Sequence, residues 1–307
     1  MDDSRVTSQI EKPPHLLGIP TALILGAGAS APYGFPLGPE LKNRLLEQTA
    51  NGQTQTLLQE LGFDLKLLRL FSDALRYGTH PTVDVFLEKK TSFRDIGSFL
   101  IALTLIPLES PQALFPQKDW YGDLFNTLNL EGLSNTDNLS IVTLNYDRSL
   151  EHFLFNNIEY NCPDILMEQA HKNREKIHIV HAHGSLGNYP DVGYGISSSN
   201  KDAIRSAADS IKIISDHLAD SDDFADAKDS IKRAERIVII GFGYNQVTLD
   251  ALLADVASDG RAIYGTAYKL DNKDRERVED FFNGNISLGS QNQTAMETLR
   301  KWNLFSQ

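Results

Sequence analysis

Three short polar segments of this 307-residue chain carry residue types that could do chemistry, and each follows an apolar run. Gly26–Ser30 reads GAGAS, Thr143–Asp147 reads TLNYD and His183–Ser185 reads HGS. A glycine turn that opens a helix suits a phosphate group, because the backbone can approach closely and the helix N-terminus favours negative charge. Strand-end Asn, Asp and His side chains lie where parallel α/β sheets place their ligands. These segments therefore predict a nucleotide site in which Asn145 and His183 do the chemistry.

The apolar runs that precede these segments predict the sheet that positions them. Ala22–Leu25, Ser140–Val142 and Ile177–Val180 are short, apolar and bounded by turn residues, as is typical of buried parallel strands. We expect two further strands, at Arg236–Gly241 and, as the last one, at Arg261–Tyr268. The stretches between them have helical spacing, so that strand, helix and strand alternate. The predicted fold is α/β, with a doubly wound, Rossmann-like parallel sheet.

A helical insertion is predicted between the first two strands, over about residues 55–135, where apolar residues recur at helical spacing and no strand pattern is visible. Within it, the run Phe99–Leu108 is too short to span a bilayer and is interpreted as a buried helix that ends near Pro107. Residues 1–18 are polar and are expected to form an N-terminal tail. The remaining residues, 19–307, are expected to form one domain.

The chain has 41 acidic and 29 basic residues, a formal net charge of −12, which argues against a nucleic-acid partner. Its one cysteine, Cys162, excludes an intramolecular disulfide and fits the reducing cytosol. Asp2 and Asp3 stand beside the first methionine and no apolar stretch follows them, so this segment does not resemble a signal peptide. We therefore expect a cytoplasmic protein that contacts neither a membrane nor nucleic acid directly.

Other interpretations of the same residues stay open. The GAGAS turn lacks the third glycine of the usual dinucleotide fingerprint, and no acidic residue follows a neighbouring second strand, which weakens a dehydrogenase interpretation. His181 and His183 alternate on one strand face, but no carboxylate or cysteine stands at ligand spacing, so no metal is predicted. His183 alone could be a core histidine beside a turn, and Asn145 alone a turn former. Asp147 could cap the helix that follows it, contact the cofactor, or do both.

Taken in order, these segments resemble those of the Sir2 (sirtuin) family, which shows GAG-x-S, T-x-N-x-D, a histidine followed by glycine, and a later G-x-G/S loop. Here that loop is Gly241–Gly243, and the order matches over about residues 19–270. The segments at 82–88, TVDVFLE, and 147–151, DRSLE, are similar to those of zinc-less Sir2-like NADases of bacterial antiphage defence. Deacylase sirtuins usually carry a zinc module of two C-x-x-C pairs, and a chain with one cysteine cannot build that module.

The resemblance implies that NAD is bound as the substrate, that no metal takes part, and that Asn145 and His183 are the catalytic pair. Histidine can act as a general base near neutral pH, and the neutral asparagine can orient water or ribose hydroxyls. The resemblance also implies NAD contacts from the glycine turn, the loop after it, the polar strand ends and the later glycine loop. These residues are Gly26, Ala27, Gly28, Ala29, Ser30, Phe35, Pro36, Asp147, Gly184, Ser185, Gly241 and Phe242.

The function implied by the resemblance is an NAD⁺ glycohydrolase that releases nicotinamide and ADP-ribose, as an NAD-depleting effector of abortive infection. Nicotinamide leaves the ribose through an oxocarbenium-like transition state, as in other glycosidic cleavages. The expected partners are NAD⁺ and further copies of the chain, a separate defence-system protein (an ATPase, an Argonaute-like protein or a phage-protein sensor), or both. Two alternatives remain, a non-catalytic module that senses NAD or ADP-ribose and an NAD-dependent protein deacylase.

Overall fold

Six parallel strands form one sheet in the order β3-β2-β1-β4-β5-β6. The computed structural model describes residues 15–115, 119–130, 136–161, 172, 175–197, 200–213 and 221–305. The strands are β1 (Thr21–Leu25), β2 (Leu139–Thr143), β3 (His178–His181), β4 (Arg236–Ile240), β5 (Ala262–Gly265) and β6 (Ile286–Leu288). The predicted doubly wound, Rossmann-like α/β fold is thereby confirmed. Strand order reverses between β1 and β4, which is the switch point where such sheets bind ligands.

Helices cover both faces of the sheet, and alternate residues of β1 show how. Leu23 and Leu25 belong to the core under α8, α9 and α15, whereas Ala22 and Ile24 belong to the core under α12, α13 and α14. Successive side chains of a strand point to opposite faces, so a strand covered on both sides is apolar throughout. The covering helices are α8 (Trp120–Leu130), α9 (Ser149–Asn161), α15 (Ala295–Trp302), α12 (Asp222–Arg233), α13 (Gln246–Leu253) and α14 (Asn272–Phe281).

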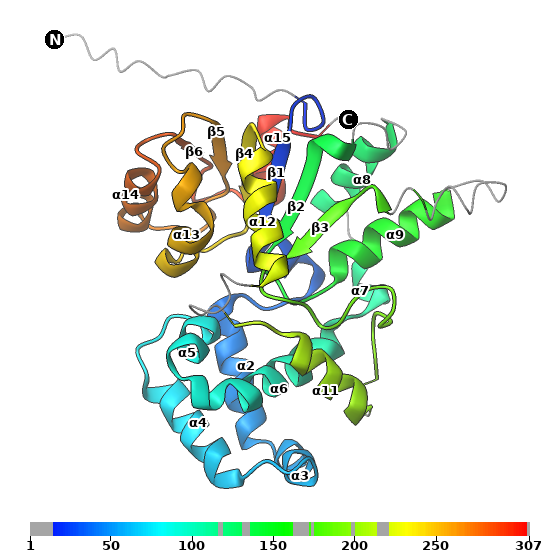
Figure 1. Ribbon diagram of the computed structural model, residues 1–307, viewed down its shortest axis with the longest axis vertical. Helices are drawn as coiled ribbons and strands as arrows, with labels where there is room; N and C mark the ends of the chain where they lie inside the picture. Colours follow the sequence, from blue (N-terminus) through cyan, green and yellow to red (C-terminus); the bar gives the residue numbers. More distant parts are fainter. Residues whose placement is uncertain are drawn as a thin grey trace.

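A separate helical layer lies beyond the carboxyl ends of the strands, in the lower half of Figure 1. It consists of α2 (Gly38–Ala50), α3 (Gly52–Glu60), α4 (Leu65–Tyr77), α5 (Val83–Lys89), α6 (Arg94–Leu105) and α11 (Lys201–Ser210). The described residues between 55 and 130 contain helices and no strand, as the apolar spacing predicts. The layer also takes in α2, before this range, and α11, which follows β3 and packs against α6. The proposed division of the chain into a tail and one domain stays a prediction.

Short elements and side-chain caps connect these helices. Asn51 accepts hydrogen bonds from two amides at the start of α3, and Asp64 and Thr82 each accept one at the start of α4 and α5. Such caps satisfy amide groups that lack a partner within the helix. The remaining elements are α1 (Ala27–Ser30), α7 (Pro111–Leu114), η1 (Ala31–Tyr33), η2 (Thr91–Phe93), η3 (Ile106–Leu108), η4 (Thr136–Asn138) and η7 (Ala254–Val256).

Helix α6 is the core of the helical layer, because every residue from Ile96 to Leu105 is buried. It gives way to a 3-10 turn at Ile106, which agrees with the helix predicted to end near Pro107. Within the described part of the chain, the segment Thr91–Leu108 has the length and mean hydropathy, 1.3, of a membrane span, but 61% of it is buried inside the protein. Burial of this kind is what the core helix of a folded layer shows.

Two features of the fold differ from the sequence-based expectation. Arg261–Tyr268 does not contain the last strand, because β6 follows it; three residues between polar neighbours are too short to show a strand pattern. Leu16 and Leu17, within the expected tail, are buried, and the Arg236 guanidinium holds the Leu16 carbonyl at 2.9 Å. Residues 1–14, Cys162 and the end of the expected insertion, 131–135, lie outside the described residues.

Candidate functional site

The loops after β1 and β4 touch at the switch point, and glycines allow this contact. The Gly28 amide donates to the Gly241 carbonyl at 2.8 Å. A Cβ atom on Gly26 would lie 2.6 Å from Cα of Phe242, and one on Gly28 would lie 2.8 Å from Cα of Gly241. Gly241 itself has φ +64°, and its Cβ would lie 2.1 Å from the Ala29 nitrogen. The predicted phosphate-binding glycines thus allow the loops after β1 and β4 to approach each other closely. Their contact with NAD stays a prediction.

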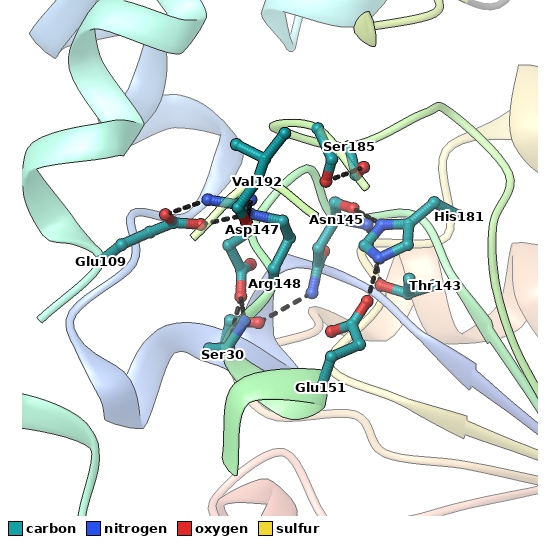
Figure 2. A network of polar contacts seen from close by, with 12 residues as sticks. Ser30, Glu109, Thr143, Asn145, Asp147, Arg148, Glu151, His181, Ser185 and Val192 are labelled. Carbon is teal, nitrogen blue, oxygen red and sulfur yellow. Dashed lines mark hydrogen bonds and ion pairs between the residues drawn. The ribbon is translucent and has the colours of Figure 1, made fainter. Parts of the chain in front are cut away.

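Asn145 joins the loop after β2 to the loop after β1. Its side-chain amide donates to the Gly26 carbonyl at 3.0 Å and to the Ser30 hydroxyl at 3.0 Å, and the second bond is drawn in Figure 2. The Asn145 backbone amide also donates to the Thr143 hydroxyl at 3.1 Å. Because β2 and β1 are neighbouring parallel strands, residues 119 positions apart meet at one edge of the sheet. The structure therefore brings Asn145 together with Gly26 and Ser30.

His181 and Glu151 form an ion pair next to the Asn145 backbone, and sequence spacing does not reveal it. Nδ1 of His181 donates to the Asn145 carbonyl at 2.8 Å, and Nε2 donates to Glu151 in a short hydrogen bond (Figure 2). The two side chains are only 14% and 10% exposed. Burial lowers the pKa of His181, but the Glu151 charge and the two hydrogen bonds outweigh it, so the pKa is raised above 6.5. Each ring nitrogen of His181 faces an oxygen acceptor, and this arrangement favours the imidazolium, in which both nitrogens donate.

Sequence reasoning finds no carboxylate at ligand spacing from His181, and the fold supplies one from α9, 30 residues away. Neither residue carries a signal for this, because the contact depends on how α9 packs on the sheet. Among the residues that the structure describes, no group of three His, Cys, Asp or Glu side chains is arranged to hold a metal ion. His181 and Glu151 thus form a pair.

His183 has the opposite surroundings. It is 5% exposed, and its Nε2 atom finds no hydrogen-bond partner among the described residues. The ring makes a hydrogen bond with the Leu144 backbone. Burial lowers the pKa of His183 below 6.5, although the Asp84 charge and the Leu144 bond act against the shift. A neutral imidazole with an unpartnered nitrogen has what a general base requires.

The helical layer reaches this site through Asp84, near the start of α5. The Tyr146 hydroxyl donates a short hydrogen bond to the Asp84 carboxylate. The Tyr146 ring lies 6.5 Å from the ring of His183, centroid to centroid. Tyr146 follows Asn145 directly, so the loop after β2 is joined to the sheet on one side and to the helical layer on the other. Asp84 lies in the segment at 82–88 that carries part of the resemblance.

Asp147 caps the helix that follows it. Its carboxylate accepts a hydrogen bond from the Ser149 amide at 3.2 Å and a short one from the Ser149 hydroxyl, and it also bonds Ser30. Burial nevertheless raises the pKa of Asp147, because desolvation outweighs these hydrogen bonds. The cap interpretation therefore describes the observed contacts, and a contact with NAD stays a prediction.

A buried ion pair fixes the loop that runs past Asp147. Arg148 and Glu109 are both 0% exposed, with Nε of Arg148 at 3.0 Å from a Glu109 carboxylate oxygen. Arg148 also donates to the carbonyls of Val192 and Gly193 at 2.6 and 3.1 Å (Figure 2). A buried guanidinium needs such partners, because an unpaired buried charge is costly. The sequence does not indicate this pair, which joins residues 39 positions apart.

The remaining predicted residues have separate contacts and differ in burial. Gly184 has φ +67° and pairs with Ile211 in an antiparallel bridge, and the Ser185 hydroxyl donates to the Gly187 carbonyl at 3.0 Å. Ala29 is buried, and its carbonyl accepts from the Trp120 indole at 2.9 Å. Phe35 and Pro36 are buried, and Ala27 and Phe242 are partly exposed.

The cavity beside Asn145 has a volume of about 10 Å³ and is lined by Ser30, Thr143, Asp147 and Glu151, among others. This is room for about one water molecule. A larger cavity of about 310 Å³ lies in the helical layer, where residues of α2, α3 and α4 line it. That cavity contains none of the residues predicted to act on NAD.

Comparison with known families adds a second line of support. The family model described as a SIR2-like domain matches residues 139–285, from the start of β2 to the residue before β6. The match contains Asn145, His183 and Gly241, and the GAGAS turn precedes it. The comparison with curated proteins found no match. Sir2-like domains bind NAD and are typically NAD-dependent enzymes. With its six-stranded parallel sheet and this match over residues 139–285, the chain contains a SIR2-like domain.

Proposed function

We propose that this protein is an NAD⁺ glycohydrolase that converts NAD⁺ and water into nicotinamide, ADP-ribose and a proton. The observation that carries the proposal is the buried, unpartnered Nε2 atom of His183, on a ring whose pKa is lowered so that it stays neutral near pH 7. His183 follows edge strand β3 of a SIR2-like domain, at the carboxyl end of the sheet, which is the end where doubly wound folds bind ligands.

In the proposed reaction, the bond between ribose C1′ and the nicotinamide nitrogen breaks, and nicotinamide leaves with the bonding electron pair. The ribose passes through an oxocarbenium-like state, and a water oxygen bonds to C1′. His183 accepts the proton that this water loses and later releases it to solvent. Asn145 orients the water or the ribose hydroxyls through its side-chain oxygen, while its amide group stays on Gly26 and Ser30.

Binding of NAD⁺ requires a movement at this site. The cavity beside Asn145, at about 10 Å³, has room for about one water molecule and is far too small for a dinucleotide. We therefore expect the loops after β1 and β2 to move together when the substrate binds, so that Asn145 keeps its hydrogen bonds to Gly26 and Ser30. The Asn145 hydrogen bonds to Gly26 and Ser30 hold these two loops together.

The biological role we propose rests on the resemblance of residues 82–88 and 147–151 to defence-associated NADases. The enzyme would act in the cytoplasm and deplete NAD during phage infection. Control would come from self-association, from a separate ATPase, Argonaute-like protein or phage-protein sensor, or from both. A protein that merely senses NAD would not need both Asn145 and His183. A deacylase of the usual kind would need four cysteines for its zinc module, and this chain has one.

The test is to incubate the purified full-length chain with NAD⁺ and no peptide, and to follow nicotinamide and ADP-ribose by chromatography. We expect equimolar release by the wild type, no release by Asn145→Ala, and wild-type release by Asn43→Ala, a control at an exposed position of α2. NAD⁺ that binds in calorimetry without being cleaved would favour the sensing module. Nicotinamide release only in the presence of an acyl-lysine peptide would favour the deacylase.

A further inference from the structure

Strand β3 carries two histidine–carboxylate pairs that differ in burial. At its start, Nε2 of His178 lies 3.4 Å from Asp226 of α12, and the two side chains are 43% and 46% exposed. At its end, His181 pairs with Glu151 of α9, and the side chains are 14% and 10% exposed. Exposed ion pairs contribute little, whereas a buried pair constrains the groups around it. Only the second pair touches the loop that carries Asn145.

We infer that His181 and Glu151 are positioning residues for the proposed reaction, since they hold the Asn145 carbonyl so that the Asn145 side chain meets Gly26 and Ser30. The inference rests on the proposed function for its kinetic consequence, but its structural part stands on the contacts alone. Glu151 fixes the ring of His181, and the other nitrogen of that ring fixes the Asn145 backbone. A charged donor makes a stronger and shorter hydrogen bond than a neutral one.

Several other hydrogen bonds hold this loop. Among them, the Leu186 amide donates to the Tyr146 carbonyl at 2.9 Å, and the Asn145 amide donates to the Thr143 hydroxyl at 3.1 Å. These bonds leave the Asn145 carbonyl to His181. Asp147 ties the loop to α9 through Ser149, and Tyr146 ties it to Asp84 in the helical layer. Both of these contacts are made by side chains of residues that follow Asn145. His181 instead holds the backbone carbonyl of Asn145 itself. Without Glu151 to fix the orientation of the His181 ring, that carbonyl would lose its donor, and the amide plane that sets the direction of the Asn145 side chain could rotate.

Two carboxylates face the His181 ring, Glu151 from α9 and Asp147 from the loop, and both favour the imidazolium. Helix α12 packs on β3 from the other face of the sheet, and its Asp226 pairs with His178. The charge of His181 is thus set by α9 and the loop. This arrangement predicts that the contact to Asn145 depends on the side chain at position 151.

The experiment compares Glu151→Ala and Glu151→Gln with Asp226→Ala, the matched change at the exposed pair of the same strand. Two readouts are taken from the full-length protein, namely kcat and KM for nicotinamide release and hydrogen exchange of the amides at 143–147 without NAD⁺. We expect Glu151→Ala to lower kcat on the order of 100-fold, the cost of a misplacement of about 1 Å, with little change in KM. Its amides at 143–147 should exchange faster.

Glu151→Gln should lose far less, because neutral His181 can donate to Asn145 through Nδ1 while Nε2 accepts from the glutamine amide. Asp226→Ala should match the wild type in both readouts. The inference is overturned if Glu151→Ala keeps wild-type kcat and exchange. A second result would also overturn it. If kcat falls as far in Glu151→Gln as in Glu151→Ala while the amides of Glu151→Gln exchange as in the wild type, the carboxylate acts chemically and does not position the loop.

The two proposals fail in different ways. A wild-type protein that releases no nicotinamide contradicts the proposed function, and hydrogen exchange at 143–147 then still decides whether Glu151 positions the loop. If Glu151→Ala does not fold, His181→Gln replaces it in both readouts. We expect His181→Gln to show the same fall in kcat and the same faster exchange. Unchanged kcat and exchange in His181→Gln would overturn the inference.

Discussion

His181 and His183 lie two positions apart at the end of β3, and both are largely enclosed, yet their surroundings oppose each other. His181 has a partner on each ring nitrogen, and the Glu151 charge raises its pKa despite burial. His183 has one nitrogen without a partner among the described residues, and burial lowers its pKa. The two pKa values shift in opposite directions because the Glu151 carboxylate lies within hydrogen-bonding distance of His181. It shows that the pKa of one residue type at one strand end can be raised or lowered by its surroundings.

The largest effect that separates the two histidines should come from His183→Ala. Loss of a general base lowers the rate by roughly 10²- to 10⁴-fold, so we expect kcat for nicotinamide release to fall by that factor. His178→Ala serves as the control, because that side chain is about half-exposed at the far end of β3. Circular dichroism would verify that both variants fold. Wild-type turnover by His183→Ala would contradict the proposal that His183 is the general base and His181 a positioning residue.

A change beside His183 should disturb that residue through the backbone. Gly184→Ala places a Cβ 2.1 Å from the Ser210 carbonyl oxygen at φ +67°. The positive φ alone costs about 1–3 kcal/mol, and the close contact adds to it, so the urea midpoint should fall clearly. Gly193→Ala is the matched control, because nothing lies within 4 Å of its added Cβ. Equal midpoints for the two variants would mean that the bridge to Ile211 does not hold His183 in place.

A smaller effect is expected at Asp84, the charge that acts on His183 from the helical layer. Asp84→Asn removes a charge that raises the pKa of His183, so this pKa should fall further. A weaker base transfers protons more slowly, and we expect kcat/KM at neutral pH to fall a few-fold. Tyr146→Phe keeps the charge and removes only the hydrogen bond, and it should leave the pKa of His183 nearer the wild-type value. The opposite ranking would show that the tyrosine, and not the charge, matters.

The smallest effect should be seen in stability, where the two histidines have opposite signs. The folded-state pKa of His181 is raised above 6.5, so its stabilisation is present below pH 6.5 and is lost as pH rises through the folded pKa. The folded-state pKa of His183 is lowered, so stability is lost as pH falls below 6.5, where the unfolded chain takes up a proton. Urea unfolding at several pH values should show the alkaline loss shrink in His181→Gln and the acidic loss shrink in His183→Gln. Identical profiles for both variants would contradict this assignment.

Much of the fold could be predicted from the sequence, and so could the meeting of polar strand-end residues at one edge of the sheet, because both depend on local pattern. Apolar runs bounded by turns indicate parallel strands, and polar residues after such strands meet at one edge of the sheet. This is how Asn145 comes to lie on Gly26, and how Gly28 and Gly241 come into contact. The helical layer is likewise visible in the spacing of its apolar residues.

What could not be predicted depends on how helices pack on the sheet. Glu151 reaches His181 only because α9 lies over β2 and β3, and Asp84 reaches Tyr146 only because the helical layer covers the strand ends. No sequence spacing encodes these contacts. Strand β6 was missed for a simpler reason, since Ile286–Leu288 is too short for a period to show.

The most direct measurement of the difference between the two histidines is their titration by NMR in protein labelled at the histidine rings. His181→Gln and His183→Gln would assign the two signals by their disappearance. We predict that in the wild type the signal of His181 titrates with a midpoint above pH 6.5 and that of His183 with a midpoint below it. A His183 midpoint at or above that of His181 would contradict the account of a fixed cation beside a neutral base.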